Sequence, residues 1–141
     1  MQFCAYRDRC HKEVEEKLRE MNMIPAAQEQ IIMELMQEDF LNEERFARSF
    51  VRGKFRIKRW GKIKIKRELK FKEISAPIIK IALTEIDQQK YTATLYELAE
   101  KKLRLIKEHY KFKKKRKLAD FLLRKGYESN LVYEAINELL E

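Results

Sequence analysis

The sequence predicts an all-α protein, built as an elongated, curved array of tandem three-helix repeats. The chain of 141 residues contains only 3 Gly and 2 Pro, whereas β-sandwiches and β-barrels need many turn residues. Apolar residues recur at helical spacing in much of the chain. The sequence also matches itself at offsets of 53 and 51 residues. A period near 50 residues indicates a repeated supersecondary unit.

The repeats are visible as aligned apolar positions. Residues 67–86 lie over residues 120–139 at the larger offset, and Leu69 then meets Leu122. At the smaller offset, Leu18 of the N-terminal part meets Leu69. Each unit reads as a helix, a basic connection, a second helix, a tight turn and a third helix. Units of this kind stack into an elongated, curved body.

Three repeats divide the chain. The first spans residues 1–40 and is partial, because too few residues precede Cys10 for a full leading helix. The second spans residues 41–90 and is strongly basic, and the third spans residues 91–141. We therefore expect a thin hydrophobic core under a heavily charged surface, since 39% of the residues are charged.

The stretch WGKIKIKRELKFKEI is ambiguous in isolation, because its apolar residues nearly alternate with charged ones as in a half-buried strand. The repeat alignment favours a helix. Ile65 aligns with Leu118, which belongs to an apolar face with spacings of three and four residues. We therefore predict a helix over residues 62–72, with Ile63 and Phe71 at its periphery or facing a partner.

The other two helices of the second repeat are predicted from residues that are typical of helix ends. The first is expected over residues 42–55, with Asn42 as its N-cap. The third is expected to start near Ser75, with Pro77 in its first turn. Its buried face should carry the apolar residues of the segment 78–86.

The third repeat shows the same order of signals. We predict its helices over residues 91–110, 117–125 and 129–140. Gly126 fits the left-handed position that ends a helix, because glycine has no Cβ to clash there.

Charge is distributed in blocks. Residues 48–117 contain 24 Lys and Arg against 7 Asp and Glu, whereas the flanking segments 1–47 and 118–141 are both net acidic. A solvated helix face usually mixes both signs. A block of one sign therefore indicates attraction to a polyanion or to an acidic partner.

The basic block holds the candidate binding residues. Cations neutralise phosphates, and interleaved aromatic side chains can stack on bases. Phe55, Tyr110 and Phe112 are interleaved in this way, and core packing is an equally good explanation for Trp60. The candidates for contact with DNA or protein are Arg48, Arg52, Lys54, Arg56, Lys58, Arg59, Trp60, Lys62, Lys64, Lys66, Arg67, Lys113, Lys114, Lys115 and Arg116.

Catalytic and metal sites are not predicted. His11 and His109 have no Ser, Cys or Asp at a recognisable nucleophile spacing. Cys4 and Cys10 would point about 240° apart on a helix, so they do not form a converging metal site. No glycine-rich nucleotide loop exists. We expect a protein without enzymatic activity or cofactor. The absence of a signal peptide and of a long apolar run predicts a cytoplasmic protein that does not enter membranes.

The segment FLNEERFARSFVRGKFRIKRWGKIKIKRELKFKEI resembles the bacterial regulatory protein RecX family. The closing segment FLLRKGYESNLVYEAINEL also resembles the last repeat of this family, and the similarity covers nearly the whole chain. The matching motif positions are Glu43-Glu44, Phe46-Ala47, Phe50-Val51, Gly61, Leu69 and Lys125-Gly126. The sequence departs from the family where a Lys-Gly turn is common, with Lys72-Glu73 and Met21-Asn22 instead. Glutamate would be strained by about 1 kcal/mol in a left-handed conformation, so the middle turn is expected to differ in shape.

The resemblance implies tandem three-helix repeats and a specific role. RecX-like proteins bind the recombinase RecA, lie along the groove of its filament on single-stranded DNA, and inhibit filament extension, ATP hydrolysis and strand exchange. They are regulators without catalytic activity, and we expect a monomer. Two alternatives remain open from the residues alone. One is a general DNA- or RNA-binding protein that acts without RecA, and the other is a helical scaffold for an acidic protein partner.

Overall fold

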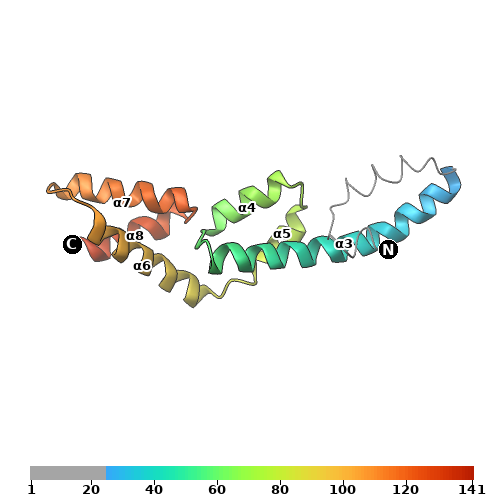
Figure 1. Cartoon of the computed structure of the whole chain (residues 1–141), viewed down its shortest axis with the longest axis horizontal. Coiled ribbons are helices and arrows are strands. Elements are labelled where there is room, and N and C mark those ends of the chain that lie inside the picture. Colours follow the sequence, from blue (N-terminus) through green and yellow to red (C-terminus); the bar gives the residue numbers. More distant parts are fainter. Residues whose placement is uncertain (1–24) are drawn as a thin grey trace.

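The computed structural model describes residues 25–141, which form helices and short connections with no β-strand in that range. The helices follow one another along an elongated body, with α3 to α5 at one end and α6 to α8 at the other (Figure 1). Their bounds are α3 Pro25–Arg56, α4 Lys62–Phe71, α5 Ala76–Leu83, α6 Gln88–Leu105, α7 Lys111–Lys125 and α8 Ser129–Leu139. The predicted all-α, three-helix repeat architecture is confirmed.

Helix α3 is longer than the sequence predicted. It runs without interruption for 32 residues, so the expected helix start at Asn42 is wrong. Asn42 is a buried residue in the helix interior, and its Oδ1 accepts a hydrogen bond from Arg45 (2.9 Å). The segment 26–41 consists mainly of Ala, Gln, Glu, Met and Leu, which favour helix, and contains no Gly or Pro. Consequently, the predicted boundary between residues 40 and 41 lies inside a helix.

Helices α4 and α5 agree with the prediction. Residues 62–71 form a helix rather than a strand, and Ile65 and Leu69 are its buried residues. Ile63 and Phe71 are exposed, as expected for peripheral positions. Ser75 is the N-cap of α5, and a proline lies in the first turn of this helix.

The third repeat starts its second helix earlier than predicted. Helix α6 ends at Leu105, because Ile106 has an extended backbone. Helix α7 begins at Lys111 instead of Lys117. The basic run 113–116 therefore lies on a helix and not in a connection. Gly126 has φ 100° at the end of α7, which confirms its predicted left-handed conformation.

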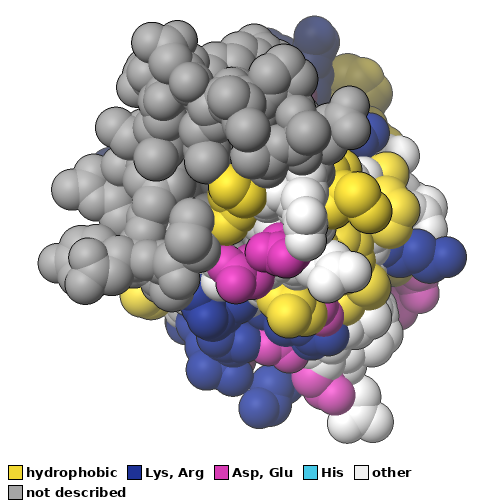
Figure 2. Space-filling view, turned by 90° about the vertical axis from the view of Figure 1, so that its right-hand side faces the viewer, with side chains coloured by type: hydrophobic (Ala, Val, Ile, Leu, Met, Phe, Trp, Pro, Cys, Tyr) yellow, Lys and Arg dark blue, Asp and Glu magenta, His cyan; other side chains and the backbone are white. Residues whose placement is uncertain are grey.

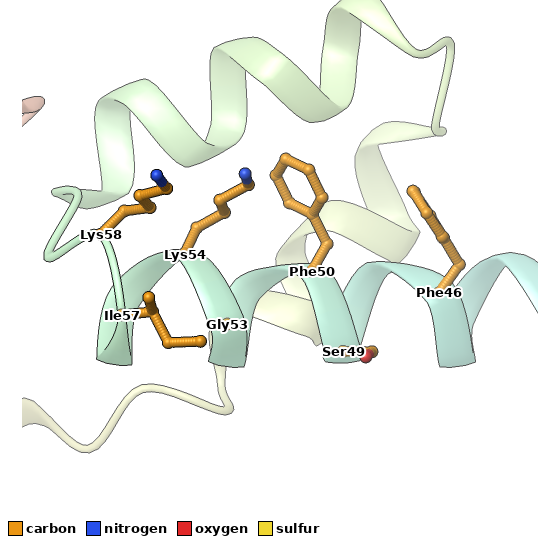
Figure 3. Close-up of a pocket in the computed structure, with 7 residues that line it drawn as sticks. All are labelled: Phe46, Ser49, Phe50, Gly53, Lys54, Ile57 and Lys58. Atoms are coloured by element: carbon orange, nitrogen blue, oxygen red, sulfur yellow. The ribbon is translucent and has the colours of Figure 1, made fainter.

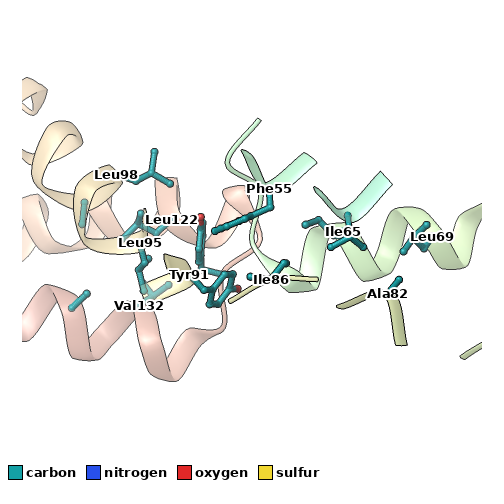
Figure 4. Close-up of a cluster of buried hydrophobic side chains, with 14 of the residues drawn as sticks. Phe55, Ile65, Leu69, Ala82, Ile86, Tyr91, Leu95, Leu98, Leu122 and Val132 are labelled. Carbon is teal, nitrogen blue, oxygen red and sulfur yellow. The ribbon is translucent and has the colours of Figure 1, made fainter. Parts of the chain in front are cut away.

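One hydrophobic core runs through both described repeats (Figure 4). Aromatic rings connect the two halves, because Tyr91 lies 5.8 Å from Phe55 and 5.1 Å from Tyr127 between ring centroids. No helix within residues 25–141 has the length and apolar character that crossing a bilayer requires. The two cysteines, His11 and the expected partial first repeat up to residue 24 lie outside the described residues.

Candidate functional site

The predicted basic residues lie on three parts of the structure. They occupy the last turns of α3 with the connection 57–61, the length of α4, and the first half of α7. Helices α4 and α7 lie along the same, upper side of the body in Figure 1. Seen from the end where α3 begins, Lys and Arg side chains gather on the lower and right-hand parts of the surface, with acidic side chains between them (Figure 2).

Two of the predicted cations, Arg48 and Arg52, form ion pairs within the second repeat. Arg48 lies 3.4 Å from Glu85 and 3.1 Å from Glu44, and Arg52 also forms an ion pair with Glu85. Glu85 follows α5, so these pairs join α3 to the end of the third helix of the same repeat. Since their charge is already balanced, Arg48 and Arg52 are poor candidates for phosphate contact.

A second group of cations stacks on aromatic rings between α3 and α4. The Nζ of Lys54 lies 5.4 Å from the ring centroid of Phe50 and 4.9 Å from that of Trp60. The Nζ of Lys64 lies 4.5 Å from Trp60, and that of Lys72 lies 5.9 Å from Phe50. These distances allow cation–π attraction. Trp60 itself is half-buried against the core, so the structure supports the core-packing interpretation of this residue.

The connection 57–61 forms the seam between the second and third repeats. The backbone amides of Gly61 and Ile63 donate to the carbonyls of Lys125 (2.8 Å) and Gly126 (2.9 Å). These bonds need the chains to approach closely, because a Cβ on Gly61 would lie 2.3 Å from the carbonyl carbon of Gly126. The seam therefore depends on glycine at position 61.

Side chains of predicted site residues also belong to this seam. The carbonyl of Arg59, a residue with φ 57°, accepts a hydrogen bond from Tyr127 Oη (3.0 Å). The guanidinium of Arg59 pairs with Glu97 (2.9 Å). The Nζ of Lys62 donates to Gln88 (3.0 Å). Arg59 and Lys62 therefore fix the relation between the repeats.

A buried tyrosine pair completes the seam. Tyr91 Oη accepts from the amide of Lys62 (2.8 Å) and donates to the carboxylate of Glu128. Burial raises the pKa of both Tyr91 and Tyr127 far above the ordinary value of 10, and the bond to Glu128 raises that of Tyr91 further. Both phenols are therefore neutral hydrogen-bond donors at physiological pH. No sequence pattern indicated these roles of Tyr91 and Tyr127.

The remaining predicted cations are available for a partner. Seven of them make no side-chain ion pair, hydrogen bond or ring contact within the described part of the chain, and all are at least partly exposed. They are Arg56, Lys58, Lys66, Arg67, Lys114, Lys115 and Arg116. Lys113 lies 5.3 Å from the ring of Tyr110. The backbone carbonyl of Lys58 accepts from Lys125 Nζ (3.2 Å), which leaves the Lys58 ammonium on the surface.

The interleaved aromatic residues have different environments. Phe55 is buried in the core, so it is not a stacking platform. Tyr110 and Phe112, at the start of α7, are 68% and 76% exposed. Glu108, just before them, forms an ion pair with Lys117 (3.4 Å). The pKa of Glu108 is lowered, chiefly because its carboxylate accepts a backbone hydrogen bond from Tyr110.

Helix α3 carries a groove that was not predicted from the sequence. Its volume is about 270 Å³, and it is more apolar than polar. Figure 3 shows Phe46, Phe50, Lys54 and Lys58 projecting in a row from α3 and its C-terminal end, toward α4. The full lining is Phe46, Ser49, Phe50, Gly53, Lys54, Ile57 and Lys58. A glycine inside a helical pattern was the signal that could have drawn attention to it.

Comparison with known proteins identifies related sequences. A family model described as the second three-helix domain of RecX matches residues 42–83, and one described as the third three-helix domain of RecX matches residues 89–136. The two matches together cover more than half of the chain. The regulatory protein RecX of Bacillus cytotoxicus is 30% identical over 139 residues, which are 99% of this chain and 52% of that protein. The regulatory protein RecX of Bacillus cereus strain B4264 is 28% identical over 137 residues, which are 97% of this chain and 51% of that protein.

Solved structures show the same architecture. The crystal structure of RecX from Lactobacillus salivarius superposes with a TM-score of 0.78 at 29% identity, covering 98% of this chain and 90% of that one. A second crystal structure of a regulatory protein RecX superposes with a TM-score of 0.70 at 25% identity, covering 97% and 68%. The chain spans about half the length of the curated relatives it matches.

Proposed function

Because this chain belongs to the RecX family, we propose that it is a negative regulator of the recombinase RecA. It binds the filament that RecA forms on single-stranded DNA and inhibits filament extension, ATP hydrolysis and strand exchange. The protein acts by binding, as a cytoplasmic monomer, and has no catalytic activity or cofactor of its own. The function is carried over from the family, and the charge distribution of this chain supports it.

The observation that carries the proposal is a group of predicted site cations on α4 and α7 whose side chains have no partner among the described residues. The group comprises Lys66 and Arg67 on α4, and Lys114, Lys115 and Arg116 on α7. An ammonium or guanidinium without a competing carboxylate can replace the counterions of a phosphate at little cost. We therefore assign phosphate contact to α4 and α7, and not to Arg48, Arg52 or Arg59.

An elongated body suits a partner that is itself extended. Repeat proteins present long surfaces that follow the shape of a target. In this structure the two repeats share one core and a hydrogen-bonded seam, so the cations of α4 and α7 are held at a fixed separation. A fixed separation favours a target with regularly spaced phosphates or acidic groups over a small globular ligand.

The alternative is a DNA- or RNA-binding protein that acts without RecA. Tyr110 and Phe112 favour it, because exposed aromatic residues beside lysines are typical of proteins that bind single strands. The two functions differ in their preferred target. A general binder holds naked nucleic acid tightly with a steep salt dependence, about 0.7 to 0.9 in log–log slope per phosphate contacted. A filament regulator binds the filament much more tightly than naked DNA.

The deciding experiment measures ATP hydrolysis by the cognate recombinase on single-stranded DNA while this protein is titrated. The DNA is kept in excess, so that competition for DNA does not lower the rate. We expect hydrolysis to fall at amounts of protein well below the amount of recombinase. Unchanged hydrolysis together with measurable DNA binding would refute the proposal and support the general nucleic-acid binder.

Charge reversal locates the phosphate contacts. Replacing Lys66, Arg67, Lys114 and Lys115 by Glu should abolish inhibition, because all four positions lose a cation and gain a repulsive charge. The matched control is Lys80→Glu with Lys101→Glu, which changes exposed lysines outside the predicted set. Full inhibition by the fourfold variant would refute this assignment of the site.

A further inference from the structure

We propose that the groove on α3 is a docking site for an amphipathic protein segment that carries carboxylates beside a large apolar side chain. This inference rests on the function proposed above and divides the basic face into two parts. The α3 groove contacts protein, whereas the unpaired cations of α4 and α7 contact phosphates. The division follows from the shape of the groove, its charge, and the ammonium groups that lie against the ring of Phe50.

The groove runs along α3 between two rows of side chains. Phe46, Phe50, Lys54 and Lys58 form one row, with a spacing of four residues that places them on one helix face. Ser49, Gly53 and Ile57 form the neighbouring row with the same spacing. Small residues at two successive positions of the second row leave the hollow, and the phenyl rings form its apolar wall. This shape admits an apolar side chain or the backbone of a second helix.

The packing of the described residues does not explain why position 53 is a glycine. A Cβ built there meets nothing within 4 Å. Its backbone is helical, so no left-handed conformation requires glycine. Glycine in a helix interior lowers stability by roughly 0.5–1 kcal/mol relative to alanine. A binding surface that needs open space at this position accounts for the glycine.

The far end of the groove carries an exposed apolar side chain beside cations. Ile57 is 80% exposed, and its neighbours Lys54 and Lys58 line the same groove. An exposed isoleucine beside two lysines suits a partner segment in which a large apolar residue is flanked by Asp or Glu. An electrically neutral or basic segment would leave the Lys58 ammonium, which has no side-chain partner among the described residues, without a counterion.

A nucleobase fits the groove less well than such a segment. Base stacking requires an open aromatic face. The ring of Phe50 has ammonium groups from Lys54 and Lys72 within 6 Å, and Trp60 has those of Lys54 and Lys64 within 5 Å. A base would have to displace these lysines before it could stack on Phe50 or Trp60. An apolar side chain entering from the side of Gly53 displaces none of them.

The first test removes the apolar contact without disturbing the fold. Ile57→Ser should weaken binding to preassembled recombinase filaments by roughly tenfold, the effect of losing one buried aliphatic side chain. Binding to naked single-stranded DNA should not change, because no charge is altered. The matched control is Leu105→Ser, which removes an apolar side chain that is 66% exposed at the end of α6, outside the groove and outside α4 and α7. It should leave both affinities unchanged.

The second test fills the groove. Gly53→Leu places a side chain in the open space and should weaken filament binding at least as much as Ile57→Ser does. Gly53→Ala should weaken it less while making the protein more resistant to urea. A variant that is more stable yet binds more weakly excludes loss of folding as the cause.

The third test identifies the occupant. A photo-reactive benzoylphenylalanine at position 57 should cross-link to the recombinase in the filament and not to the DNA. Cross-linking to DNA would overturn the inference in favour of nucleic acid in the groove. If Ile57→Ser and Gly53→Leu both bound the filament as tightly as the wild type, the inference would also be overturned. The proposed function would then remain intact. Failure of the wild-type protein to bind the filament would overturn the proposed function and this inference together.

Discussion

The second and third repeats close their second helices with the same backbone turn, made from different residues. The turn position is occupied by Glu73 with φ 63° in the second repeat and by Gly126 with φ 100° in the third. In both, the amide of the next residue donates to the carbonyl five positions back, at 3.1 Å and 3.3 Å respectively. The residue after the turn is buried in both cases. The middle turn thus has the same shape as the turn of the third repeat, contrary to the expectation from its glutamate.

The difference lies in what surrounds the two turns. A Cβ on Gly126 would lie 2.3 Å from the Cβ of Lys64, because the N-terminus of α4 packs directly on this turn. Glu73 is exposed, so its side chain has room and only the backbone strain of about 1–2 kcal/mol remains. Glycine is therefore required where two repeats meet, whereas a strained residue is tolerated where the turn faces outward.

The largest change in stability is expected when a methyl group is added at the seam. Gly61→Ala should lower the free energy of unfolding by roughly 2–4 kcal/mol, because its Cβ clashes with backbone atoms and separates the hydrogen-bonded chains. Urea denaturation measures the change. Gly53→Ala is the control, since its methyl group enters open space and should raise the free energy of unfolding by about 0.5–1 kcal/mol. Equal effects of the two substitutions would contradict the close packing of the seam.

A smaller loss is expected when one seam hydrogen bond is removed. Tyr127→Phe deletes the donor to the carbonyl of Arg59 and leaves that oxygen without this partner. The free energy of unfolding should fall by about 1–2 kcal/mol. Tyr133→Phe, which removes a half-exposed phenol on α8, should change it by less than about 0.5 kcal/mol. Indistinguishable urea midpoints would show that the seam does not depend on this bond.

A substitution at the outward-facing turn is expected to raise the free energy of unfolding instead of lowering it. Glu73→Gly should raise the free energy of unfolding by up to about 1 kcal/mol, because glycine relieves the left-handed strain but gains more freedom in the unfolded chain. Glu73→Ala keeps the Cβ and removes the carboxylate. The difference between the two variants isolates the backbone contribution, and a glycine variant no more stable than the alanine variant would rule out strain at this position.

The smallest effect is expected within the third repeat and depends on pH. Tyr96 donates to Glu138 (2.7 Å), and this bond raises the pKa of Tyr96 from 10 to about 12. Below pH 10 the phenol is neutral in folded and unfolded chains, so the bond contributes fully. As pH rises from 10 to 12, ionisation favours the unfolded chain and the contribution is lost. The difference in urea midpoint between the wild type and Tyr96→Phe should therefore be smaller at pH 11 than at pH 8.

Sequence patterns predicted the helices well where each position has an aligned counterpart. The strand-like segment around Ile65 was correctly assigned to a helix because its counterpart around Leu118 is plainly helical. The start of α3 was missed, since the capping preference of Asn42 is weaker than the uninterrupted helix propensity before it. The start of α7 was also missed, because a lysine-rich segment shows little apolar periodicity.

The candidate site was only partly predictable for a different reason. Charge can be counted along a sequence, but the pairing of charges depends on contacts between distant segments. In the sequence, Arg52 and Arg67 are both arginines of the basic block, and nothing distinguishes their charges. In the structure, Arg52 pairs with Glu85, whereas Arg67 has no side-chain partner within the described residues. The α3 groove depends on the absence of side-chain atoms at Gly53, which composition and charge do not reveal.

Because α3 is continuous, the buried side chains near its two ends have a fixed orientation relative to each other. Each residue of an α-helix turns the chain by about 100°. The buried positions Leu35 and Asp39 and the buried positions Val51 and Phe55 lie on this single helix, so the residue count between them fixes their relative direction. One residue inserted near position 45 would rotate the two sets by about 100°, whereas seven would restore them to within about 20°. Insertions within α3 are therefore tolerated only in lengths that keep the two buried sets on the same side of the helix. Insertions in the connections between helices are not constrained in this way.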